Sequence, residues 1–163
     1  MTTSADRHLG LIATLGLVAH PEGGYYSEVY RSPARVKPED GREPRSALTT
    51  IYFLLPQGQV SRWHRVQSDE AWHFYEGAPL ELWVTKDLRR IERHRLGPVE
   101  EGQEPVVVVP AGCWQAARPT GGYTLVGCTV GPGFDFKDFA MARDEPTVAA
   151  ALRKAGAPVA ELL

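Results

Sequence analysis

The sequence predicts an all-β domain, a barrel or sandwich with one short helix at each end. Short β-branched and aromatic runs recur along most of the chain, and Gly and Pro turn signals separate them. The 163 residues match the size of one ordinary domain, and no repeat, low-complexity tract or linker divides them. We therefore expect one domain over residues 1–163, with its barrel between about residues 22 and 140.

A helix is expected near each terminus. Between about residues 6 and 15, apolar side chains such as Leu9 and Ile12 roughly follow one helical face. Near the other end, Pro146 suits the first turn of a helix over about residues 146–155, which a following glycine stops.

The strands are predicted from runs that are rich in β-branched and aromatic side chains and bounded by turn residues. These runs cover residues 25–30, 48–55, 71–75, 80–84, 106–109 and 123–130. Residues 32–44 are polar and contain proline, so we expect an exposed loop there, and residues 87–104 form a second polar insertion.

Composition argues against several classes of function. The formal net charge of −2 provides no basic field for nucleic acid or an anionic membrane, so neither partner is expected. Cys113 and Cys128 have no CxxC spacing, which disfavours a disulfide framework and a structural zinc site. The apolar stretch at residues 9–19 is too short to span a bilayer and lacks the basic start of a signal peptide, so we expect a cytoplasmic protein.

Two segments carry most of the potential chemistry. Residues 61–77, SRWHRVQSDEAWHFYEG, gather histidines, acidic residues and aromatics on a strand, turn and strand, and PAGCWQ follows at residues 110–115. This pairing resembles the two motifs of the cupin superfamily, a Gly, His-x-His, Glu and Gly pattern and a Pro-x-Gly-x-x-His pattern. His64 takes the place of the first His and Glu70 that of the Glu, whereas Val66 and Gln115 replace the other two histidines. Two of the four usual metal ligands are therefore missing.

A closer resemblance covers nearly the whole chain. Its strings are HPEGGYYSEVYRS, TTIYFLL, SRWHRVQSDEAWHFYEGAPL, VPAGCWQAA and LVGCTVGPGFDFKDF. They are similar to a cupin subfamily long catalogued only as a domain of unknown function. The resemblance implies a double-stranded β-helix, the jelly-roll barrel of cupins, which is commonly dimeric and similar in architecture to sugar-nucleotide epimerases. It implies no particular reaction, because fold is not function.

The candidate metal ligands are His64, Glu70 and Gln115. A divalent first-row metal needs several imidazole or carboxylate donors, and Val66 cannot supply one. His73 could add a second imidazole, but strand alternation turns it to the face opposite Glu70. We therefore favour a metal-free site over a tightly held divalent metal, and no cofactor is certain.

Without metal, His64 beside Asp69 or Glu70 forms a candidate acid/base pair, because a carboxylate orients an imidazole and raises its basicity. Such a pair suits proton abstraction next to a carbonyl. A phenol on the opposite wall could return the proton, and Tyr26 and Tyr52 are the candidates.

Other side chains are expected to contact the ligand. Arg31 could clamp a carboxylate or phosphate, and Glu22 lies on a Gly-Gly loop that could cover the barrel mouth. The indoles of Trp72 and Trp114 neighbour the motif residues and could wall the pocket. Asp138 is expected to be solvated. The full set of expected ligand-binding residues is Ser61, Asp69, Trp72, Trp114, Gln115, Arg31 and Glu22.

Three functions fit these residues. The first is a small-molecule cupin of the isomerase or epimerase kind, with a polar or sugar-like ligand inside the barrel and His64 as acid/base. The second is a metal-dependent oxygenase or lyase, and the third is a non-catalytic ligand-binding or sensing domain. A homodimer is expected separately, because the strand that begins at Tyr25 could add to the sheet of a neighbour.

Overall fold

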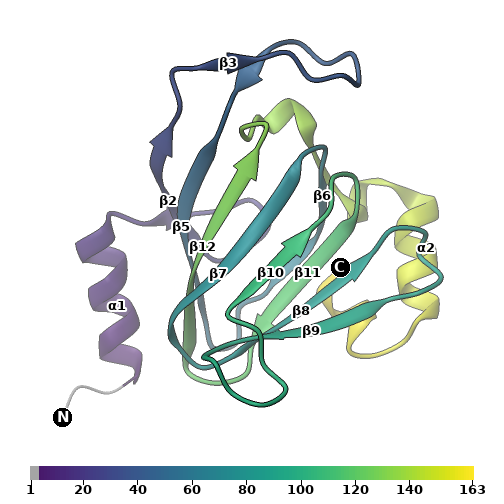
Figure 1. The fold of residues 1–163 in the computed structure, drawn as a ribbon. Helices are drawn as coiled ribbons and strands as arrows, with labels where there is room; N and C mark the ends of the chain where they lie inside the picture. The colour runs from purple at the N-terminus through teal and green to yellow at the C-terminus, as the bar shows by residue number, and fades with distance from the viewer. Residues whose placement is uncertain (1–3) are drawn as a thin grey trace.

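The computed structural model describes the backbone of residues 4–163 and the side chains from Arg7 onward. Its two antiparallel sheets face each other as a jelly-roll barrel, with a helix near each end of the chain (Figure 1). One sheet has the order β1 (Val18–Ala19), β2 (Tyr25–Arg31), β5 (Thr49–Pro56), β12 (Tyr123–Gly131), β7 (Asp69–Gly77) and β10 (Val106–Val109). The other has the order β13 (Phe139–Met141), β6 (Ser61–Val66), β11 (Trp114–Pro119), β8 (Leu80–Thr85) and β9 (Glu92–Leu96). The predicted fold class is confirmed.

The two sheets pack their inner faces around an apolar core that fills one end of the barrel. Phe53, Trp72 and Val126 form the centre of this core, and each is about 1% exposed. The opposite end lies where β5 and β7 begin and β12 ends, and there Val130 pairs with both Thr49 and Glu70. Polar side chains replace large apolar ones at that end, which leaves room for a cavity.

Helices and further apolar clusters cover the outside of the barrel. α1 (Ser4–Leu15) packs Leu11 against Leu54 and Leu125 on the outer face of the first sheet. α2 (Pro146–Lys154) buries Leu152 with three tryptophans on the outside of the second sheet. Short 3-10 helices lie at η1 (Phe136–Asp138), η2 (Ala142–Asp144) and η3 (Val159–Leu162). No helix in the described part of the chain is long and apolar enough to cross a membrane.

Two polar segments are more ordered than predicted. β9 lies inside the expected insertion at residues 87–104 and pairs with β8, because Leu96 anchors an otherwise polar edge strand in the core. β3 (Arg35–Val36) and β4 (Arg45–Ser46) form a small hairpin where a loop was expected.

Asp138 is buried, so the expectation that it is solvated was wrong. Its Oδ1 accepts from Arg45 Nη2 at 2.9 Å, and its Oδ2 accepts from Arg45 Nε and Arg42 Nη1, both at 2.9 Å. These bonds pair the carboxylate with two guanidinium groups, which compensates its removal from water. They also tie the β3–β4 hairpin to η1, next to the open end of the barrel.

Candidate functional site

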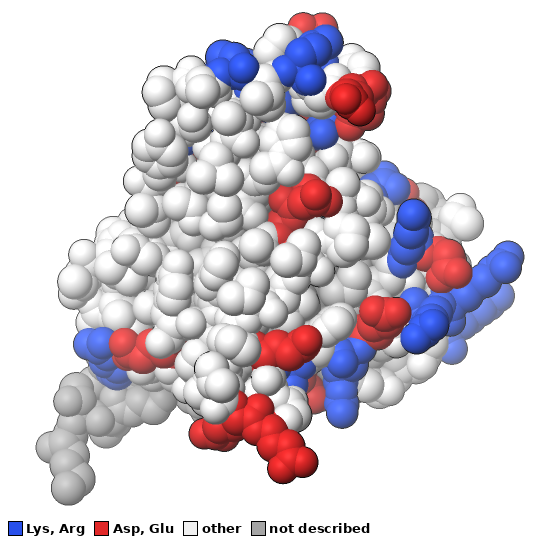
Figure 2. Space-filling model, in the orientation of Figure 1, with Lys and Arg blue, Asp and Glu red and all other residues white. Residues whose placement is uncertain are grey.

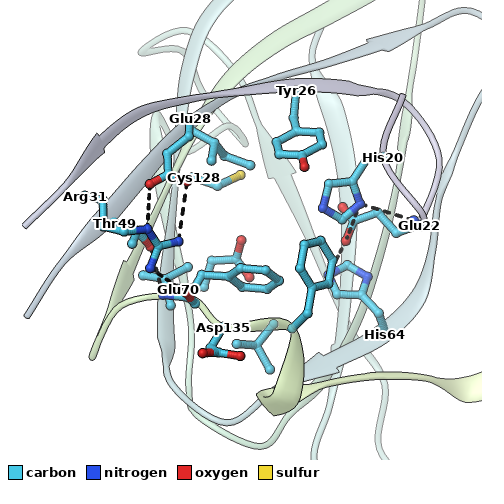
Figure 3. A pocket seen from close by; sticks show the side chains of 15 residues that line it. His20, Glu22, Tyr26, Glu28, Arg31, Thr49, His64, Glu70, Cys128 and Asp135 are labelled. Atoms are coloured by element: carbon cyan, nitrogen blue, oxygen red, sulfur yellow. Dashed lines mark hydrogen bonds and ion pairs between the residues drawn. The ribbon is translucent and has the colours of Figure 1, made fainter. Parts of the chain in front are cut away.

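A cavity of about 320 Å³ opens at the polar end of the barrel (Figure 3). Four buried or partly buried titratable side chains lie at its deep end: His20, Glu22, His64 and Glu70. Apolar walls come from the two sheets and from the chain around η1. The full lining is His20, Glu22, Tyr26, Glu28, Arg31, Thr49, Ile51, His64, Val66, Glu70, Cys128, Val130, Phe134, Asp135 and Phe136.

His64 reaches the cavity from β6 and is almost completely buried. Its Nδ1 lies 2.7 Å from the carbonyl oxygen of Arg62, and because a carbonyl only accepts, Nδ1 carries the proton. The basic nitrogen of the neutral ring is therefore Nε2. The ring also stacks on Phe139 with centroids 5.5 Å apart. Burial lowers the pKa of His64 and keeps the ring neutral.

Glu22 is the carboxylate partner of His64. Its Oε2 lies 3.0 Å from His64 Nε2, and its Oε1 accepts a hydrogen bond from Ser61 Oγ at 2.9 Å. Burial raises the pKa of Glu22 to about 8, against the opposing effect of the Ser61 hydroxyl. Since 3.0 Å is within proton-transfer distance, the two groups form a candidate acid/base pair.

The local chain explains how Glu22 enters the barrel. The turn between β1 and β2 needs Gly23, whose φ is 106° and whose added Cβ would collide with the carbonyl oxygen of Val60. Glu22 O also accepts from the backbone N–H of Arg62 at 2.7 Å. This turn therefore lies against β6, two residues from His64.

Glu70 lies on β7 and is held by a chain of hydrogen bonds. Its Oε2 accepts from Gln115 Nε2 at 2.6 Å, and Gln115 Oε1 accepts from Trp72 Nε1 at 2.9 Å. Burial raises the pKa of Glu70 to about 7, although the charge of His64 acts to lower it and that of Glu22 acts to raise it. The carboxyl can therefore gain or lose a proton near neutral pH.

Arg31 lies at the mouth of the cavity and supplies a positive charge there. Arg31 Nε donates to Glu28 Oε1 at 2.7 Å, and its Nη1 donates to the carbonyl oxygen of Phe134 at 3.0 Å. Both charged side chains are partly exposed. Tyr26 also lines the cavity, and its hydroxyl points inward in Figure 3. A polar ligand would therefore meet donors and acceptors at both ends of the cavity.

Three predicted site residues lie away from the cavity. Tyr52 is on the outer face of β5, where it packs with Tyr75 and the α1 cluster, because Thr49, Ile51 and Phe53 occupy the inner face. Trp114 packs in the cluster under α2, with the guanidinium of Arg65 4.6 Å from its ring centroid. Asp69 is exposed and accepts from the backbone N–H of Ala111 at 2.8 Å.

Three other predicted site residues do not line the cavity but lie in the hydrogen-bond networks of the residues that do. Ser61 binds Glu22, while Trp72 and Gln115 extend the hydrogen bonds of Glu70, and none of the three lines the cavity. Of the two carboxylates expected beside His64, Asp69 binds a backbone N–H elsewhere, whereas Glu70 lies near enough for its charge to raise the pKa of His64. The carboxylate found 3.0 Å from the ring is that of Glu22, which was not expected as its partner. Alternating side-chain direction explains the burial of Glu70, but the approach of the Glu22 turn depends on a long-range contact.

The set proposed for metal does not fit a metal site. Gln115 uses its amide oxygen to accept from Trp72 and its amide nitrogen to donate to Glu70. His73 lies on β7, where it pairs with Val106 of β10, and it does not line the cavity. In the part of the chain that the structure describes, no three His, Cys, Asp or Glu side chains converge as a metal requires.

His20, Glu28 and Cys128 also line the cavity, although they were not predicted as site residues. His20 begins the HPEGG segment, and its position two residues before Glu22 was the available signal. Cys128 lies on the inner face of β12. Glu28 belongs to β2, the strand that also carries Tyr26 and Arg31. Alternation of side chains along a strand does not by itself show which face lines the pocket.

Comparisons with known proteins agree with this architecture. Residues 10–142 match the family model described as Cupin superfamily (DUF985). A Shewanella oneidensis protein with a known X-ray crystal structure is 34% identical in sequence to this chain. The match covers 94% of each chain, and the two structures superpose with a TM-score of 0.82. A hypothetical protein from Leishmania major is 37% identical, covering 90% of this chain and 96% of its own, with a TM-score of 0.78. An uncharacterized protein of Saccharomyces cerevisiae is 27% identical over 151 residues, 83% of this chain and 75% of that protein.

Proposed function

Because this chain belongs to the DUF985 branch of the cupin superfamily, we propose that it is an enzyme of the isomerase or epimerase kind that acts on a small polar molecule inside its barrel. The buried pair of His64 and Glu22, at the deep end of the cavity, is the observation that carries this proposal. A volume of about 320 Å³ suits a ligand of roughly monosaccharide size.

The pair suits proton abstraction from a carbon next to a carbonyl. His64 is fixed by Arg62 so that Nε2 is the basic atom, and its lowered pKa keeps this nitrogen free of charge. When Nε2 takes a proton from the ligand, an ionised Glu22 at 3.0 Å compensates the new positive charge. The competent form of the pair therefore requires loss of the proton on Glu22, whose pKa is about 8.

Other cavity residues support the same reaction. Glu70 lies close enough for its charge to raise the pKa of His64, so it helps to stabilise the imidazolium. The hydroxyl of Tyr26 points into the cavity and could return a proton from another wall. Removal from one face and return to another inverts a stereocentre, whereas return to a neighbouring atom isomerises the ligand.

Deuterium wash-in tests this proposal without knowledge of the natural ligand. The protein is incubated in D₂O with a panel of keto sugars, small carbohydrates and nucleotide sugars, and carbon-bound deuterium is followed by NMR. We expect at least one compound to exchange, and His64→Gln to slow that exchange by about 100-fold or more. His94→Gln is the matched control, because His94 Nδ1 also lies 3.1 Å from a carboxylate, Glu104, but outside the cavity.

The outcomes separate catalysis from binding. Equal exchange by wild type and His64→Gln would refute the acid/base role of His64. Binding of a panel compound without any exchange would instead support a ligand-binding or sensing domain.

We also propose that the protein forms a homodimer. The outer face of the first sheet exposes Tyr75, Val106 and Val108, and Figure 2 shows a broad uncharged area on this side of the molecule. An exposed apolar sheet face of this kind is typical of an interface. Sedimentation velocity at micromolar concentration tests this, and a monomer would refute it.

A further inference from the structure

His20 presents an uncharged hydrogen-bond donor to the cavity. It directly follows β1, and its ring contacts Tyr26 edge-on with centroids 4.7 Å apart. The backbone N–H of Glu22 donates to His20 Nδ1 at 3.2 Å. A nitrogen that accepts a hydrogen bond carries no proton, so the proton of the neutral ring lies on Nε2.

The Nε2 atom faces the cavity. In Figure 3 the Nδ1 side of the ring is directed toward Glu22 and the other ring nitrogen toward the middle of the pocket. Among the residues that the structure describes, His20 Nε2 has no hydrogen-bonding partner, although the ring is mostly buried. An N–H that faces a cavity and has no protein acceptor is suited to a ligand oxygen.

The surroundings of the ring keep it neutral. Phe53, Phe136 and Phe139 lie with ring centroids between 5.9 and 6.2 Å from it. The titratable groups that face it are His64, Tyr26 and Glu22, whose Oε2 is 3.7 Å from Nδ1. Burial lowers the pKa of His20 to about 3, with a smaller contribution from the repulsion that a protonated His64 would exert.

We propose that His20 donates its Nε2–H to the carbonyl oxygen of the bound ligand, next to the carbon from which His64 removes a proton. A neutral donor stabilises the enolate that forms without a competing positive charge, as a neutral imidazole does in other enolising enzymes. The ligand class is then a hydroxy aldehyde or hydroxy ketone, which has both an acceptor oxygen and an acidic neighbouring C–H. This inference rests on the proposed function.

Nitrogen-15 NMR of the histidine rings tests the donor directly. We expect His20, identified by the signals lost in His20→Phe, to show the Nε2–H tautomer from pH 5 to pH 8. An Nδ1–H tautomer, or an imidazolium at pH 6, would overturn the inference. The tautomer itself is read from the wild-type protein, and His20→Gln supplies the assignment if His20→Phe does not fold.

Binding of acetohydroxamate, a small mimic of an enolate, tests the role of the donor. We expect the probe to shift the His20 Nε2–H signal, and His20→Phe to weaken binding by about 10-fold, while His20→Gln, which keeps an N–H, retains most of it. Equal affinity of wild type and His20→Phe, or no binding to wild type, would overturn the inference. Probe binding that depends on His20, without deuterium wash-in for any sugar, would overturn only the proposed reaction.

Discussion

Replacement of Glu22 by glutamine should make the protein more stable and less active. Glutamine has the shape of a protonated glutamate, so its Oε1 can still accept from Ser61 Oγ and its amide can still approach His64 Nε2. The substitution removes only the ability to ionise. In our proposal the ionised form is the one that activates His64, so deuterium wash-in should fall by about 100-fold or more.

The gain in stability follows from the pKa of Glu22. Burial raises that pKa from 4.5 to about 8, so between these values the folded protein binds a proton that the unfolded chain releases. The free energy of unfolding of the wild type therefore falls as pH rises through this window, by about 1.4 kcal/mol for each pH unit. The stability of Glu22→Gln relative to wild type should grow from about 1 kcal/mol at pH 5 to about 4 kcal/mol at pH 8.

Urea unfolding of both proteins at pH 5, 6, 7 and 8 measures this difference. Glu76→Gln is the control, because hydrogen bonds from Arg7 and Tyr123 lower the pKa of Glu76 to about 2. Glu76 is then ionised in both the folded and the unfolded protein from pH 5 to pH 8, so this variant should lose stability by an amount that hardly changes with pH. A difference between wild type and Glu22→Gln that does not change with pH would refute the reasoning. Such a result would mean that Glu22 is ionised in the folded protein throughout this range.

Two further predictions concern the hydrogen-bond chain and the missing metal ligands. Gln115→Leu leaves the indole of Trp72 and the carboxyl of Glu70 without their partner, so the free energy of unfolding should fall by about 2–4 kcal/mol, with the loss measured by urea unfolding. It should also raise the pKa of Glu70, because the bond from Gln115 lowers it; an unchanged pKa by carbon-13 NMR would contradict this. Combining Val66→His with Gln115→His restores the cupin ligand pattern next to His64, which pairs with Gln115 across β6 and β11. Elemental analysis should find stoichiometric divalent metal in this double variant and little in wild type. Stoichiometric metal in wild type that is lost in His64→Ala would overturn the interpretation that the natural site holds no metal.

Most of the fold could be predicted from the sequence alone. Runs such as residues 123–130 and 106–109 have few alternatives to a strand, because β-branched side chains between turn residues disfavour helix. Alternation along β7 also predicted that His73 faces away from Glu70. β9 escaped prediction because an edge strand with polar side chains resembles a loop in sequence.

The assembly of the site depends on contacts between distant parts of the chain. His64 and Glu22 meet because the turn before β2 packs against β6, a contact between segments far apart in the chain that no local pattern specifies. The same holds for the two tyrosine candidates, since each strand has two faces and only its packing decides which one is inside. Tyr26 faces the cavity, whereas Tyr52 lies under α1. Local propensity sets the strands, but side-chain convergence depends on which sheet faces close around the core.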